Sequence, residues 1–111
     1  MEFSETLKNN FEFRRVYGRG KSLAAANMVL YCRKNHLSEN RLGITVSAKL
    51  GGAVQRNRVR RRLREIYRLH EKSFSCGYDL VAVARGRGMR ASYQALEEDF
   101  LYLAGKLGVL K

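Results

Sequence analysis

The sequence contains no proline and no tryptophan, and it has only two cysteines and ten acidic residues. Without proline, no residue obliges a helix or strand to break. Cys32 and Cys76 do not have the CxxC spacing of a zinc or redox site, so we expect two unpaired thiols and no metal site. No apolar run approaches the ~20 residues of a membrane span, and the N-terminus MEFSETLKNN lacks the apolar segment of a secretory signal. These absences predict a cytoplasmic protein without a membrane partner.

The scarcity of acids leaves a strong positive charge. Lys and Arg number 22 against 10 Asp and Glu, which gives a formal net charge of +12 over 111 residues. A small domain with so much self-repulsion usually has a polyanionic partner, with nucleic acid as the first candidate and an anionic membrane surface as the second. The length and the 45% hydrophobic content fit one compact domain over residues 1–111.

Hydrophobic periodicity predicts three helices. Asn10 is expected to cap the first helix, which ends by Gly20; the second runs from Ala53 to about Leu69; and Ser92 caps a third, which Gly108 terminates. The periodic residues that share one face are Phe13, Val16 and Tyr17 in the first helix, the core-facing stripe Val59, Leu63, Ile66, Tyr67 and His70 in the second, and Tyr93, Leu96, Phe100, Leu103, Ala104 and Leu107 in the third.

Short segments rich in β-forming residues predict the strands. Residues 27–33 and 42–47, joined by the polar turn KNHLSEN, are expected to form an antiparallel pair, and residues 21–24 form a weaker strand. The nearly continuous apolar run at 78–84 is typical of a central strand that is covered on both faces. The order of elements predicts an α/β (α+β) two-layer sandwich without linkers or repeats.

Residues 53–64 read AVQRNRVRRRLR, and seven arginines lie between Arg56 and Arg68. Like charges four residues apart on a helix repel by ~0.2 to 0.5 kcal/mol per pair, and phosphates turn that repulsion into attraction. The arginine fork binds phosphate in two places and stacks on bases, while an asparagine can meet a base edge or a 2′-hydroxyl. A solvated charged face is the alternative, but such faces usually mix both signs. Two neighbouring rows of the predicted helix carry Asn57, Arg58, Arg61, Arg62, Arg64 and Arg68.

Two loops carry weaker signals for phosphate binding. Lys49, Gly51 and Gly52 precede the arginine helix and fit either an anion nest or a plain tight turn. The segment RGRGMR at 85–90 offers three arginines on a flexible backbone, or is simply a solvated connection. The histidines have no partners at metal spacing, and the helix dipole explains the acids at 97–99, so we expect no catalytic residue and no metal ligand in the polypeptide.

The segment TVSAKLGGAVQRNRVRRRLRE, residues 45–65, closely resembles the signature of the bacterial ribonuclease P protein subunit. In that signature, a strand ending in Val-Ser is followed by Lys, a Gly loop, Ala-Val, and then Arg-Asn-Arg on a helix. The resemblance extends to FRRVYGRGKS at 13–22, with aromatic residues four apart, and to YDLVAVAR at 78–85. It therefore covers nearly the whole chain.

The resemblance implies a ribonucleoprotein whose large catalytic RNA removes the 5′ leader from precursor tRNA and leaves a 5′-phosphate, with Mg²⁺ held mainly by RNA and no DNA partner. It implies a cleft for the single-stranded leader lined by Phe13, Tyr17 and Tyr31, although ordinary core packing is an alternative role for Phe13. It also implies the order α-β-β-β-α-β-α with a left-handed crossover, against the usual handedness. The residues it implies for binding the RNA subunit are Lys49, Arg56, Asn57, Arg58, Arg61, Arg62, Arg64 and Arg68.

Two other functions fit parts of the sequence. A ribosomal protein would bury the same basic helix in ribosomal RNA, but would have no use for an open aromatic cleft. A stand-alone, metal-dependent nuclease would cut precursor tRNA without an RNA cofactor, but it requires a cluster of carboxylates, which the sequence does not suggest.

Overall fold

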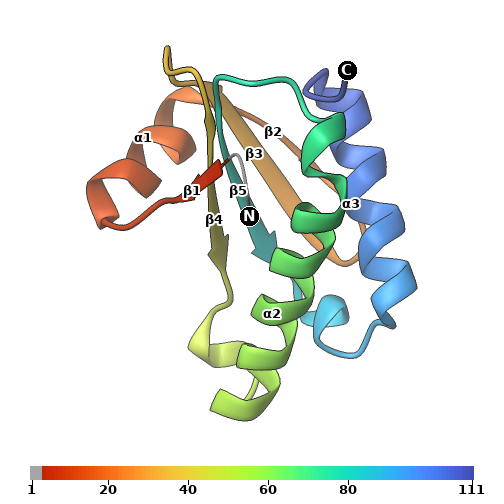
Figure 1. Cartoon of the computed structure of the whole chain (residues 1–111). Coiled ribbons are helices and arrows are strands. Elements are labelled where there is room, and N and C mark those ends of the chain that lie inside the picture. The colour runs from red at the N-terminus through yellow and green to blue at the C-terminus, as the bar shows by residue number, and fades with distance from the viewer. Residues whose placement is uncertain (1–3) are drawn as a thin grey trace.

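The structure is a computed structural model, and it describes residues 4–111 (Figure 1). Within this range the chain forms three α-helices and one five-stranded sheet, with short 3-10 turns between them. The helices are α1 (Asn10–Arg19), α2 (Ala53–His70) and α3 (Tyr93–Leu107), and the strands are β1 (Ser4–Thr6), β2 (Lys21–Ala24), β3 (Met28–Lys34), β4 (Asn40–Thr45) and β5 (Tyr78–Ala84).

The sheet has the strand order β1-β4-β5-β3-β2, with β5 in the centre. β5 runs antiparallel to β3 and parallel to β4. The central place of the apolar run at 78–84 is confirmed, but the predicted antiparallel pair of 27–33 with 42–47 is wrong, because β5 lies between these segments. The reason is burial: Leu80 and Val81 point to opposite faces and both are fully buried, so this strand is least exposed with a neighbour on each side.

The connection from β4 to β5 runs through α2, so these parallel neighbours form a crossover unit. In Figure 1 both arrows point down, β5 lies to the right of β4, and α2 passes on the viewer's side of the sheet. This arrangement is left-handed. Nearly all such connections in proteins are right-handed, so the exception implied by the resemblance is present here.

Helices lie on both faces of the sheet, with α2 and α3 on one face and α1 on the other (Figure 1). The larger core forms between the sheet and the α2–α3 layer, and its fully buried side chains include Leu30, Leu63, Tyr67, Phe74 and Phe100. A smaller cluster on the α1 face centres on Leu7, Val16 and Val81. The predicted α/β class is confirmed, and α1 covers only part of its face.

The helix ends follow capping chemistry. Asn9, not the predicted Asn10, caps α1: its Oδ1 accepts the Glu12 N–H at 2.9 Å, and Glu12 Oε1 accepts the Asn9 N–H at 3.2 Å. This reciprocal pair requires an acid three residues after the cap, which Asn9 has and Asn10 lacks. The predicted ends of α3 are confirmed, with Ser92 as its cap and Gly108 in the left-handed region at φ 78°.

The short strand β1 was not predicted. Its three residues, SET, are polar and show no alternation, so no sequence signal marks them as a strand. β1 pairs in parallel with β4, and Ser4 Oγ lies 2.6 Å from the hydroxyl of Tyr67 on α2. The weaker strand at 21–24 is confirmed as β2.

Candidate nucleic-acid interface

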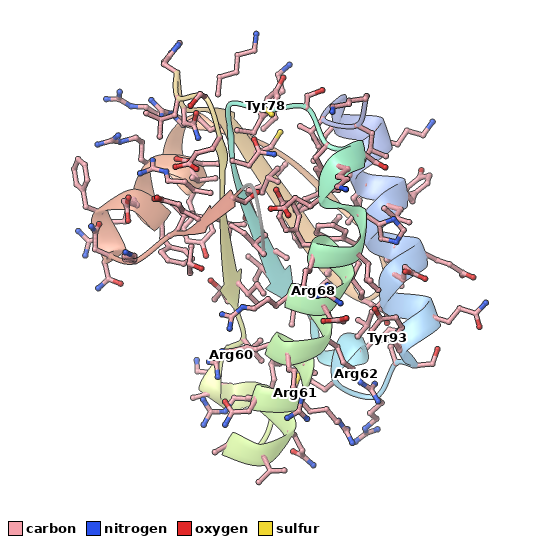
Figure 2. The ribbon with its side chains drawn as sticks, viewed as in Figure 1. Arg60, Arg61, Arg62, Arg68, Tyr78 and Tyr93 are labelled. Atoms are coloured by element: carbon pink, nitrogen blue, oxygen red, sulfur yellow. The ribbon has the colours of Figure 1, made fainter. Side chains whose placement is uncertain are left out.

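The α2 helix turns its apolar side to the core and its arginines outward. In Figure 2, nitrogen-tipped side chains, Arg61 and Arg62 among them, surround the N-terminal half of this helix. His70, at the end of the predicted stripe, is half-buried, and its Nε2 lies 2.8 Å from Glu97 Oε2 on α3. The rest of the stripe is buried as predicted, at Val59, Leu63, Ile66 and Tyr67. The outward side of α2 therefore carries a row of positive charge on a rigid helix. We call it the arginine ridge; its residues are Arg56, Arg58, Arg61, Arg62, Arg64 and Arg68.

The arginines of α2 differ in what they contact. Arg56 and Arg62 donate to backbone carbonyl oxygens at 3.1 and 3.3 Å. Arg68 pairs with Glu65 one turn earlier, and their hydrogen bonds raise the pKa of Arg68 and lower the pKa of Glu65. Among the described residues, no hydrogen bond or ion pair occupies the exposed guanidinium groups of Arg58, Arg61 and Arg64.

Asn57 lies within this ridge and already has one partner. Its Oδ1 accepts a hydrogen bond from Arg60 at 3.1 Å, and Arg60 also donates to the carbonyl oxygen of Val46 at 3.4 Å. Arg60, which was not among the predicted contact residues, thus ties α2 to the chain just after β4. The amide nitrogen of Asn57 remains available as a donor.

Lys49 lies in the 3-10 turn η1 (Ala48–Leu50), which leads into the Gly-Gly loop. The backbone N–H of Lys49 donates to Ser47 Oγ at 3.3 Å, and that of Gly52 donates to Gln55 Oε1 at 3.1 Å. Two donors of the predicted anion nest therefore have partners within the protein. What the loop presents outward is the Lys49 ammonium group.

The connection RGRGMR between β5 and α3 is a hydrogen-bonded turn. It contains the 3-10 turn η3 (Gly86–Met89), and Arg85 N donates to Asn27 O at 3.0 Å. A Cβ at position 88 would lie 2.3 Å from the same Asn27 oxygen, so this close approach requires Gly88. The turn helps to form a hollow of about 720 Å³ whose basic lining residues are Lys49, Arg87 and Arg90.

The three predicted cleft aromatics lie together on the sheet face that α1 partly covers. The ring of Tyr17 is 6.4 Å from that of Phe13 and 4.9 Å from that of Tyr31, between centroids. Tyr17 is 38% exposed, and its hydroxyl is hydrogen-bonded to Thr45 Oγ1 at 2.8 Å. A hollow of about 270 Å³ is lined by Phe13, Tyr17, Thr45 and Asn10. The group combines accessible ring surface with hydroxyls.

Two neighbours of this aromatic group were missed from sequence. A Cβ at position 43 would lie 2.6 Å from Phe13 Cε1, so Gly43 on β4 is what lets this ring pack against the strand. An isolated glycine inside a strand signals such an approach and could have identified it. Thr45 carried no signal, because its place beside Tyr17 depends on which face of β4 it occupies. Phe13 also packs against the smaller core cluster, so the core-packing role considered for it is present.

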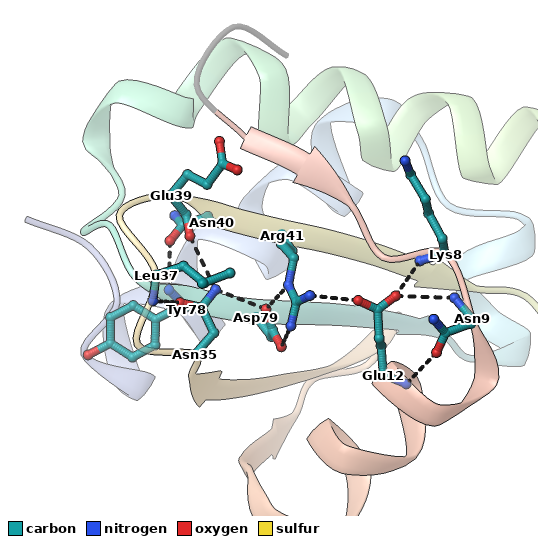
Figure 3. A network of polar contacts seen from close by, with 10 residues as sticks. All are labelled: Lys8, Asn9, Glu12, Asn35, Leu37, Glu39, Asn40, Arg41, Tyr78 and Asp79. Carbon is teal, nitrogen blue, oxygen red and sulfur yellow. Dashed lines mark hydrogen bonds and ion pairs between the residues drawn. The ribbon is translucent and has the colours of Figure 1, made fainter.

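A polar network fixes α1 to the sheet beside these aromatics (Figure 3). Arg41 on β4 binds both carboxylate oxygens of Asp79 on β5 at 2.8 Å, and its third nitrogen lies 2.6 Å from Glu12 Oε2 on α1. Asp79 is fully buried and also accepts a hydrogen bond from Asn35 Nδ2 at 3.0 Å. The three charged groups therefore join α1, β4 and β5 at one point.

The charges of this network are mutually stabilised. The backbone N–H of Lys8 lowers the pKa of Glu12, partial burial opposes that shift, and the N–H of Asn9 and the Arg41 guanidinium lower it further. Hydrogen bonding to Asp79 raises the pKa of Arg41. The first turn of α1 is thus held on the sheet by charge-assisted hydrogen bonds, which fix the position of the aromatic row that follows it.

Other candidate chemistry is sparse in residues 4–111. No three His, Cys, Asp or Glu side chains of this range gather where they could hold a metal ion. Cys32 is buried, which raises the pKa of its thiol, and neither it nor Cys76 forms a disulfide. None of the described helices has the length and apolarity needed to cross a membrane.

Comparison with known proteins points to one family. A family model described as Ribonuclease P matches residues 1–108 of this chain. The ribonuclease P protein component of Natranaerobius thermophilus is 42% identical over 106 residues, which cover 96% of this chain and 92% of the relative. That of Clostridium botulinum strain Loch Maree is 44% identical over 104 residues, 93% of this chain and 94% of the relative.

Solved structures give the same result. The fold matches the RNase P protein of Staphylococcus aureus with a TM-score of 0.88 at 30% identity, over 96% of this chain and 97% of the other. It matches the RNase P protein of Thermotoga maritima with a TM-score of 0.81 at 32% identity, over 88% and 93%.

Proposed function

This chain belongs to the ribonuclease P protein family, and from that premise we propose that it docks onto a catalytic RNA through α2 and holds the 5′ leader of precursor tRNA beside α1. As a ribonuclease P protein component it acts in tRNA processing as part of a ribonucleoprotein. The proposal assigns two RNA-binding sites to two parts of the fold, the arginine ridge and the aromatic cleft.

The observation that carries the proposal is the set of unpaired guanidinium groups of Arg58, Arg61 and Arg64 on one rigid helix. An 18-residue helix already fixes the backbone positions of these charges, so no backbone conformational entropy is lost when phosphates bind. Arg56 and Arg62 keep the ridge attached to neighbouring backbone while their remaining N–H groups face the RNA. Lys49 and the Asn57 amide extend the same surface.

The leader site uses a different physical principle. A single-stranded leader presents unpaired bases, and each base that stacks on an aromatic ring gains ~1 to 3 kcal/mol with little dependence on sequence. Tyr17, which is 38% exposed, is the ring best placed for such stacking, with Phe13 and Tyr31 beside it. A processing factor that meets many leaders requires this tolerance.

In this division of labour the RNA subunit performs the phosphodiester cleavage with Mg²⁺ that it mainly holds itself. The polypeptide contributes positive charge, which reduces repulsion between two RNAs, and a grip on the leader that positions the precursor. No side chain of the protein takes part in bond cleavage under this proposal. The polypeptide should therefore be most needed at low Mg²⁺, where repulsion is least screened.

Reconstitution tests the proposed function. The polypeptide is combined with a ribonuclease P RNA and precursor tRNA at low Mg²⁺, and cleavage is compared with each component left out. We expect fast removal of the leader only with all components present. Cleavage by the polypeptide alone would support a protein nuclease, and an unchanged rate when the polypeptide is added would support a purely structural RNA-binding protein.

Substitution of Tyr17 tests the cleft. Tyr17→Ala removes a stacking surface, so affinity for precursor tRNA should fall by roughly 5- to 150-fold, the equivalent of one lost stack, while affinity for mature tRNA stays the same. Both affinities are measured by titration of the assembled holoenzyme. Tyr17→Phe, which keeps the ring, should bind nearly normally, and Tyr102→Ala controls for loss of an exposed aromatic on α3. Equal losses for the two tRNA forms would remove the leader from this cleft.

A further inference from the structure

The α1 helix has a second surface that the proposed function does not use. Arginines line a hollow of about 540 Å³ on its other flank, and this hollow shares no lining residue with the aromatic one. On a helix with 100° per residue, the row that begins at Phe11 lies about 200° from the row of Phe13 and Tyr17, with the buried Val16 between them. We call this surface the outer site; its residues are Phe11, Arg14, Arg15, Arg19 and Arg33.

The charges of the outer site are uncompensated. Four of its five lining residues are arginines and none is an acid. Within residues 4–111, Arg14, Arg19 and Arg33 form no hydrogen bond or ion pair through their side chains. Helical neighbours of like charge repel by ~0.2 to 0.5 kcal/mol per pair at four-residue spacing, as in Arg15 and Arg19. The arrangement is unfavourable for the isolated protein and becomes favourable when an anion binds.

An exposed aromatic ring stands among these arginines. Phe11 is 65% exposed, and the guanidinium carbon of Arg15 lies 4.5 Å from the centre of its ring. This cation–π contact fixes the ring beside the positive groups, and most of the ring surface remains exposed to solvent. A ring and several guanidinium groups around one hollow are the elements of a site for an unpaired base and its flanking phosphates.

We propose that the outer site binds a second segment of single-stranded RNA, with a base stacked on Phe11 and the phosphates on the arginines. A duplex would offer phosphates but no free base for the ring. An anionic membrane would require a broad apolar face, and Phe11 is the only apolar lining residue of this hollow. The site is separate from the cleft, so α1 carries RNA on two flanks.

The absence of tryptophan from the chain makes a direct test possible. Phe11→Trp places a single indole at the site, and stacking of a base on it quenches its fluorescence. We expect saturable quenching when the full-length Phe11→Trp protein is titrated with an oligoadenylate, and little quenching with the same strand in a duplex. The quenching should persist with Tyr17→Ala, since the cleft does not contribute to it.

Tyr102→Trp is the matched control, because Tyr102 on α3 is also exposed, at 57%, and also lies near a cation, Lys106. It should show no saturable quenching. The proposal is overturned if Phe11→Trp is not quenched, if duplex and single strand quench it equally, or if the Tyr102→Trp protein responds in the same way. None of these results depends on whether Tyr17 holds a leader, so failure here and failure of the cleft can be told apart.

Charge substitutions test the phosphate contacts. Arg15→Gln with Arg19→Gln in the Phe11→Trp protein should make the salt dependence shallower. The magnitude of the slope of log K against log salt should decrease by roughly 1.4, about 0.7 for each lost phosphate contact. An unchanged slope would contradict the arginine contacts.

Two RNA sources share this chemistry, and precursors with short and long leaders distinguish them. If the upstream leader occupies the site, Phe11→Ala weakens holoenzyme binding only of the long-leader precursor; if a segment of the RNA subunit does, Phe11→Ala weakens assembly instead.

Discussion

Arg41→Ala is expected to lower the free energy of unfolding by about 3 to 5 kcal/mol, the usual cost of leaving a buried charge without its partner. Asp79 is 0% exposed and receives two hydrogen bonds from Arg41 at 2.8 Å each. After the substitution, Asn35 would be its one remaining side-chain donor. Urea denaturation followed by circular dichroism measures the change.

The controls separate charge from geometry. Arg41→Lys keeps the charge but loses the two-pronged contact, so its stability should lie between those of the wild type and Arg41→Ala. Asp79→Asn, added to Arg41→Ala, removes the stranded charge and should restore part of the loss. Arg61→Ala, an exposed arginine without a described partner, should change stability by less than about 0.5 kcal/mol. A loss of that small size for Arg41→Ala would mean that the network does not hold α1 to the sheet.

The triple substitution of Arg58, Arg61 and Arg64 by alanine is expected to have the largest effect on assembly with the RNA subunit. A hydrogen bond to a charged group is worth about 1.5 to 3 kcal/mol, so three lost phosphate contacts should weaken binding by at least about 1000-fold. The magnitude of the slope of log K against log salt should decrease by about 2 to 3, depending on whether the phosphates lie in single strands or duplex. Titration of labelled RNA subunit at several salt concentrations gives both quantities.

Net charge alone cannot explain such a loss if remote lysines behave differently. Lys106 and Lys111 lie at the C-terminal end of the chain, beside the last turn of α2 and at the opposite end of that helix from Arg61 (Figures 1 and 2), and their joint replacement by alanine should change affinity by only a few-fold. The triple variant should also unfold at the same urea concentration as the wild type, since its three side chains are exposed. If the lysine and arginine variants lost equal affinity, the ridge would be a diffuse electrostatic contact and not a docking site.

Much of the fold was predictable because its signals are local. The apolar stripe of α2, the Ser92 cap and the left-handed Gly108 depend on residues within one or two helical turns of each other. The continuous apolar run of β5 predicted a central strand for the same reason. The choice of Asn10 as a cap failed on a local detail, because a reciprocal cap depends on the acid three residues later.

Strand pairing was not predictable in this way. The segments that became β3 and β4 are adjacent in sequence and suggested a hairpin, yet β5, which follows 33 positions after the last residue of β4, lies between them. The β-forming character of a segment says that it pairs but not with which partner. That choice depended on burying both faces of β5 at once, a property of the whole sheet.

The sequence by itself determined the charge, the helical ridge of arginines and the aromatic spacing on α1, since each follows from residue type and a fixed helical repeat. Only the tertiary structure decided which arginines are unpaired, that Gly43 makes room for Phe13, and that Thr45 meets Tyr17. Such contacts join positions far apart in the chain, and they exist because packing and strand register bring those positions within a few ångströms.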